Sequence, residues 1–169
     1  MRPFVSAFAA TTFLACTALA PLASAEPCAH PSEIRAFEVA SLKSELMVVA
    51  IACQAQDRYN DFVMRFRHDL LSGERALHDY FARVAGRGGQ KRHDDYITNL
   101  ANAQSEDGVQ QGTLFCQQHL GMFNEVMALG TGNDLPAYAL SKSLVQPIAL
   151  SECTETTKTR KKLHTASEK

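Results

Sequence analysis

The residue types best suited to chemistry in this chain are three histidine–aspartate pairs. They are His68-Asp69, His78-Asp79 and His93-Asp94. Imidazole nitrogens and carboxylate oxygens bind divalent metals in hydrolases and serve as partners in acid–base catalysis. The pairs therefore suggest one alternative function, a small metal-dependent hydrolase that uses His68, His78, His93 and Asp94.

A pair of adjacent residues is a poor chelator on a helix. Neighbouring side chains point about 100° apart, so one such pair does not easily hold an ion alone. The letters resemble those of metal-dependent phosphohydrolases of the HD class, which use one His, a His-Asp pair and a distant Asp, all on helices. Here the intervals are short and the chain is small for that fold. The residues identify no family, and we expect no catalytic residue, metal or cofactor unless the three histidines converge.

A second polar cluster is basic. Arg87, Lys91 and Arg92 surround a run of glycines that precedes a predicted helix. Backbone N–H groups at a helix N-terminus attract anions, so this cluster predicts a phosphate, sulfate or acidic-polymer site. The alternative interpretation is a solvated loop whose arginines pair with Asp94 and Asp95. The run lacks the Gly-Lys-Ser/Thr ending of a P-loop.

Uncharged side chains suggest a third function, a carrier with a small-molecule pocket. Asn99 and Asn102 lie three residues apart and could bind a ligand or bond to a neighbouring helix. Aromatic side chains could line the pocket, but at helical spacing we interpret them as core. These aromatic residues are Phe62, Phe66, Tyr80, Phe81, Phe115 and Phe123.

The elements that must position these residues are helices. Leu42, Leu46, Val49 and Cys53 follow one another at intervals of four, three and four, which predicts that Ser41–Leu71 is one long helix or two end to end. Further helices are expected over residues 33–40, 74–84, 91–104, 110–129 and 135–145, with breaks at 72–73 and 105–108. No segment has the two-residue period of a strand. The predicted fold is an all-α, single-domain bundle of five or six helices.

Residues 1–25 have the pattern of a cleaved signal peptide. Arg2 precedes an apolar run that ends in Ala23-Ser24-Ala25, a small-x-small cleavage site. The alternative is a lipoprotein signal in which Cys16 is lipidated. We expect no stable membrane span after cleavage, and a periplasmic or secreted location in a bacterial envelope.

Cleavage leaves four cysteines, Cys28, Cys53, Cys116 and Cys153. An even number of cysteines in an exported chain predicts two disulfides. We expect Cys53–Cys116, because both residues lie in helical apolar stripes, and Cys28–Cys153, because both lie in terminal connecting segments. The alternative pairs neighbours along the chain, Cys28 with Cys53 and Cys116 with Cys153.

The charge distribution separates a folded domain, residues 26–153, from a basic tail, residues 154–169, which we expect to be disordered. The tail holds five basic and two acidic residues, and the domain holds 11 basic and 16 acidic, a net charge of −5. An acidic domain is not typical of a nucleic-acid binder. The sequence favours an exported small helical protein with a non-enzymatic binding or structural role, whose partner is another envelope protein.

Overall fold

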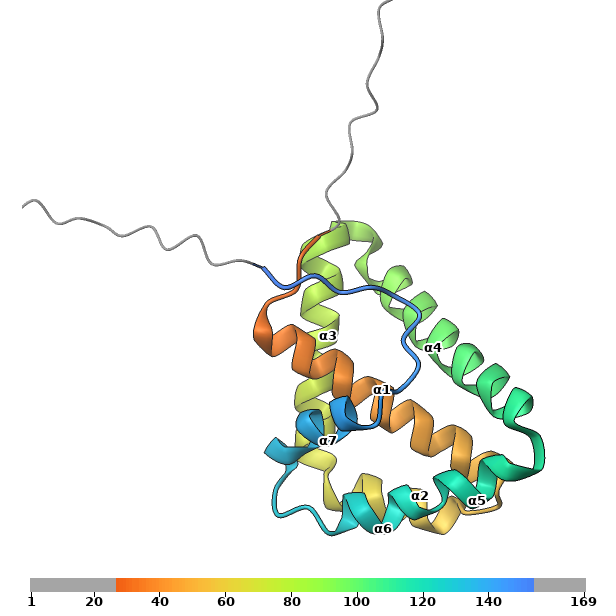
Figure 1. Ribbon diagram of the computed structural model, residues 1–169. Helices are drawn as coiled ribbons and strands as arrows, with labels where there is room; N and C mark the ends of the chain where they lie inside the picture. Colours follow the sequence, from red (N-terminus) through yellow and green to blue (C-terminus); the bar gives the residue numbers. More distant parts are fainter. Residues whose placement is uncertain (1–26, 154–169) are drawn as a thin grey trace, which may run out of the picture.

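The computed structural model describes residues 27–153, and they form a bundle of helices stapled by two disulfides, as predicted. Two long helices diverge from a tight turn at Gly86–Gly88, and a third long helix crosses between them (Figure 1). Shorter helices close the wide end. The helices are α1 (Pro31–Ala52), α2 (Gln56–Arg65), α3 (Arg67–Ala85), α4 (Gly89–Gln111), α5 (Phe115–His119), α6 (Gly121–Met127) and α7 (Leu135–Ser141). No described helix is both long and apolar enough to cross a membrane.

Helix α1 is the crossing helix and the centre of the molecule. Most of its residues are buried, around nearly the whole circumference, as expected of a helix with other elements on several sides. Its first turn is fixed by Glu33, whose carboxylate accepts a 2.7 Å hydrogen bond from the backbone N–H of His30. The Nε of Arg83 on α3 donates to the same carboxylate at 3.0 Å. The short helix expected over residues 33–40 is not separate, because α1 runs without a break from Pro31 to Ala52.

The stretch Ser41–Leu71 is not one continuous helix. Helix α1 ends at Ala52, and Gln54 adopts a left-handed backbone with φ of 57° before α2 begins. A second, milder interruption at Phe66 separates α2 from α3. No glycine or proline marks either position, so local sequence did not indicate these breaks.

The predicted breaks at Ser72-Gly73 and Ser105–Gly108 are wrong. Both segments are helical, within α3 and α4. One glycine inside a helix costs only about 1 kcal/mol relative to alanine, and the packing of α3 and α4 on α1 and on each other outweighs that preference. The expected helix over residues 110–129 is also interrupted, because Gly112 takes a positive φ of 60° and ends α4.

The core has two parts on either side of α1's midpoint. One joins α1 to α2, α5, α6 and α7, and the other joins its N-terminal half to α3 and α4. In the second part, the ring of Phe37 makes edge contacts with Tyr80 and Tyr96, each at 5.0 Å between centroids. The six aromatic residues interpreted as core are all buried: Phe62, Phe66, Tyr80, Phe81, Phe115 and Phe123.

Both predicted disulfides are present. Cys53–Cys116 joins residues 63 apart, and Cys28–Cys153 joins residues 125 apart. Closing a loop of either length restricts the unfolded chain by about 4–5 kcal/mol in the entropy model. The second disulfide is supported by backbone pairing, since the N–H of Ala29 donates to Ser151 at 2.8 Å and the N–H of Cys153 donates to Ala29 at 2.9 Å. The two ends of the described chain are thus tied together. The predicted signal peptide, Cys16 and the basic tail lie outside the described residues.

Candidate binding surface

The three histidines do not form a metal site. His68 and His78 are ten residues apart on α3, which separates them by about 15 Å along the helix. His93 on α4 comes near His78, with ring centroids 6.4 Å apart. Within residues 27–153 no group of three His, Cys, Asp or Glu residues is arranged to hold a metal ion. The structure therefore does not assemble the hydrolase site that the His-Asp pairs suggested.

His93 instead connects helices. It is buried, and its Nε2 lies 2.9 Å from Oε1 of Glu74 on α3, close enough for an ion pair although not aligned as a hydrogen bond. Glu74 also approaches the Nζ of Lys43 on α1, at 3.7 Å. Asp94 beside His93 accepts a hydrogen bond from Gln90 at 2.9 Å on the exposed side of α4. This arrangement links α1, α3 and α4 near the point where α3 and α4 are joined.

The predicted basic cluster is divided. Lys91 pairs with Asp95 one turn along α4, at 2.6 Å, whereas the loop interpretation expected an arginine to make this pair. Arg87 lies in the exposed turn between α3 and α4. Arg92 points to a different place, a cleft between α3, α4 and the C-terminal segment. The three side chains therefore do not act as one anion site.

The most unusual surface is apolar. Among residues 27–153, six large hydrophobic side chains are exposed: Ile51, Met64, Leu71, Val109, Leu114 and Leu140. Four of these six line two neighbouring grooves. Ile51 and Val109 line a groove of about 470 Å³ between α1, α4 and α5, while Met64 and Leu71 line one of about 400 Å³ between α1, α2 and α3. Apolar side chains gathered in this way mark interaction sites more often than scattered ones do.

The two grooves share one face of α1. Lys43 lines the second groove, and Met47 and Ile51 line the first. These residues are spaced four apart, so they lie one above another on the same side of the helix. The second groove is completed by α2 and α3, and the first by α4 and α5. We call the two grooves together the apolar face.

Sequence periodicity did not identify the apolar face. Periodicity finds the buried stripe, and in α2 and α3 that stripe contains Phe62, Phe66 and Leu70. Met64 and Leu71 are apolar residues that fall outside it. An apolar residue that falls outside the buried stripe of its own helix indicates an exposed apolar surface, because its side chain points away from the core.

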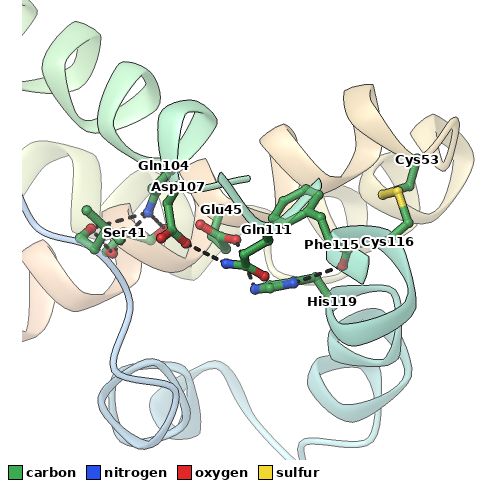
Figure 2. Close-up of polar contacts among 10 residues, drawn as sticks. Ser41, Glu45, Cys53, Gln104, Asp107, Gln111, Phe115, Cys116 and His119 are labelled. Carbon is green, nitrogen blue, oxygen red and sulfur yellow. Dashed lines mark hydrogen bonds and ion pairs between the residues drawn. A yellow bond between two sulfur atoms is a disulfide. The ribbon is translucent and has the colours of Figure 1, made fainter. Parts of the chain in front are cut away.

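A buried polar seam lies between α1, α4 and α5. Glu45 is only 4% exposed, and Gln104 is fully buried, with its Nε2 donating to the backbone oxygen of Ser41 at 3.1 Å. His119 Nδ1 lies 2.9 Å from the Phe115 carbonyl oxygen and so donates a hydrogen bond to it. Figure 2 shows these side chains together beside the Cys53–Cys116 disulfide. The seam fixes the short α5 against the two long helices.

Glu45 has an unusual electrostatic environment. Burial raises the pKa of its carboxyl, the nearby charge of Asp107 raises the pKa further, and His119 opposes both. Asp107 itself accepts a hydrogen bond from Gln111 at 2.6 Å. Perturbed carboxyls often mark catalytic sites. Glu45 lines neither groove of the apolar face.

Comparison with known proteins gave no guidance, since no family model, curated protein or solved structure matches the chain.

Proposed function

We propose that this protein is an exported, non-enzymatic binding protein of the bacterial envelope, and that it docks another envelope protein at the apolar face. The observation that carries the proposal is the gathering of Ile51, Met64, Leu71 and Val109 around one side of α1. Two disulfides support a compartment more oxidising than the cytosol. The signal-peptide pattern of residues 1–25 supports export.

The shape of the face favours a helix as the docked element. Lys43 and Ile51 are eight residues apart, so the shared side of α1 extends about 12 Å. An amphipathic helix of two to three turns would place side chains at positions i, i+4 and i+7 into the two grooves. Full burial of an exposed Ile or Val side chain contributes about 1.5–3 kcal/mol, which makes Ile51 and Val109 the expected energetic centre of the contact.

The charges at the edge favour an acidic residue on the partner. Arg67 lines the second groove and makes no ion pair or hydrogen bond within residues 27–153. Lys43 and Glu74 also line it, but they approach each other at 3.7 Å and so partly satisfy one another. Arg67 is therefore the cation left to pair with a carboxylate of the docked helix.

The test begins with crosslinking of the mature protein in its envelope extract, followed by purification of the captured partner. The partner is then titrated against the wild-type protein and the Val109→Ser, Ile51→Ser and Leu140→Ser variants. Leu140 on α7 is the matched control, because its side chain is 68% exposed but lines neither groove. We expect Val109→Ser and Ile51→Ser to weaken binding at least about tenfold, as loss of roughly 1.4 kcal/mol requires, and Leu140→Ser to leave it unchanged.

Two results would overturn the proposal. Equal weakening by Leu140→Ser and Val109→Ser would show that the apolar face does not carry the contact. Stoichiometric zinc, manganese or iron in the purified protein would instead favour the hydrolase suggested by the His-Asp pairs.

A further inference from the structure

A cleft of about 520 Å³ lies apart from the apolar face, between α3, α4 and the C-terminal segment. Tyr80 and Val84 of α3 form one wall, Arg92 and Asn99 of α4 form another, and residues 147–149 form the third. The volume lies within the range of small-molecule sites. The third wall is covalently fixed, because the Cys28–Cys153 disulfide holds the end of that segment beside Ala29.

Two polar side chains are available in this cleft. Arg92 and Asn99 make no ion pair or hydrogen bond with the rest of residues 27–153. They are seven residues apart on α4, so they lie on one face of the helix about 10 Å apart along its axis. Asp95 also lines the cleft, but Lys91 pairs with its carboxylate at 2.6 Å. The cleft therefore has a free guanidinium and a free amide on the same face of α4.

Apolar and aromatic side chains also line this cleft. Phe81, Val84 and Ile148 line it, together with Tyr80 and Tyr96. Both tyrosines are almost wholly buried, and the hydroxyl of Tyr96 is engaged in a 3.1 Å hydrogen bond to Gln146. These side chains can make hydrophobic contact with the body of a ligand.

We infer that this cleft binds a small organic carboxylate that has a compact apolar body and a polar group at the opposite end. A guanidinium recognises a carboxylate through two parallel hydrogen bonds, which an ammonium cannot match. The amide of Asn99 can donate to or accept from a hydroxyl. The site is independent of the apolar face and goes beyond the proposed docking function.

The probe is 3-(4-hydroxyphenyl)propanoate, titrated into the ¹⁵N-labelled mature protein and followed by NMR. We expect saturable shifts in the α3, α4 and C-terminal residues of the cleft. Arg92→Gln should weaken binding about twofold to fivefold, the size of one exposed charge contact. Arg87→Gln removes the same charge from the neighbouring turn, outside the cleft, and should leave binding unchanged.

Two further comparisons test the two ends of the ligand. Asn99→Ala should weaken binding of the hydroxylated probe but not of 3-phenylpropanoate, which lacks the hydroxyl. Tyramine, which carries an amine instead of the carboxylate, should not bind. Arg92 and Asn99 are exposed, so a melting curve is expected to show that both variants fold. The inference is overturned if Arg87→Gln and Arg92→Gln weaken binding equally, if tyramine binds as tightly as the acid, or if no saturable shift occurs.

Discussion

Oε1 of Glu45 lies 3.7 Å from Nε2 of His119, which places a carboxyl and an imidazole together in the seam between α1, α4 and α5. The pKa of Glu45 is raised by burial and by Asp107 despite the attraction of His119. A raised pKa in the folded state means that the contribution of Glu45 to stability is fully present below its unfolded value, near pH 4.5. That contribution is then lost as the pH rises through the folded value.

The first prediction follows from the upward shift in the pKa of Glu45. Wild-type protein should lose stability relative to Glu45→Gln as the pH is raised from about 4 to 7, because only the wild type must ionise a buried carboxyl. Urea unfolding at several pH values measures the difference. Asp107→Asn serves as a control that should reduce the pH dependence without removing it. Parallel stability curves for the wild type and Glu45→Gln would contradict the assignment.

The second prediction concerns two glycines in the long helices. A Cβ at Gly89 would lie 2.8 Å from the Cα of Ala82, where α4 approaches α3, so Gly89→Ala should destabilise the protein by about 1–3 kcal/mol. A Cβ at Gly73 would lie 3.6 Å from Val39, an ordinary contact, so Gly73→Ala should be neutral or stabilising by up to about 1 kcal/mol. Thermal melting of the two variants provides the comparison. Similar melting temperatures would show that the close approach at Gly89 is readily relaxed.

The third prediction concerns the disulfides. Full reduction should lower the melting temperature substantially, since each bond contributes about 4–5 kcal/mol in the entropy model. Replacing only Cys28 and Cys153 by serine should release one wall of the carboxylate cleft while the partner still binds the apolar face. Calorimetry and the two binding assays measure these effects separately. If the melting temperature is the same with and without reductant, the bonds contribute nothing to stability.

The fourth prediction is that metals do not stabilise this fold. A ligand bound only to the native state raises the melting temperature in proportion to its concentration and affinity. We expect zinc, manganese and EDTA to leave the melting temperature unchanged, because His93 contacts Glu74 and the three histidines do not converge. Melting curves with each addition, for the wild type and His78→Gln, test this. A zinc-dependent rise that His78→Gln abolishes would reveal a site at His78 and His93.

The features that sequence predicted are those that depend on periodicity and on covalent chemistry. The stripe through Leu42, Leu46 and Val49 is buried, and the cysteines of the stripes pair with each other. The helix expected over residues 74–84 ends close to its predicted end, at Ala85. Each of these follows from the chain itself, without knowledge of what packs against it.

The features that sequence did not predict depend on contacts between distant segments. Gly73 and residues 105–108 stay helical because they belong to long helices packed against α1 and against each other. Gln54 adopts a left-handed backbone, although no glycine or proline next to it in the sequence indicates a break. The sequence placed Arg92 in a basic cluster and Asn99 in a separate pair of asparagines, and only the fold shows that they line one cleft. The carboxylate site could not have been assembled before the path of the C-terminal segment was known.

The bond between Cys28 and Cys153 has a topological consequence. The disulfide closes the domain into a covalent ring, and a hydrogen bond between Ala29 and Ser151 supports the junction. Figure 1 shows that this junction lies where α3 and α4 are joined, and Val109 is near the opposite end of α4. Where a ring begins has little influence on its packing, and proteins with adjacent termini tolerate circular permutation. A chain that started at Gly88, ended at Arg87 and linked the old termini would retain the same architecture, with new ends in the exposed turn.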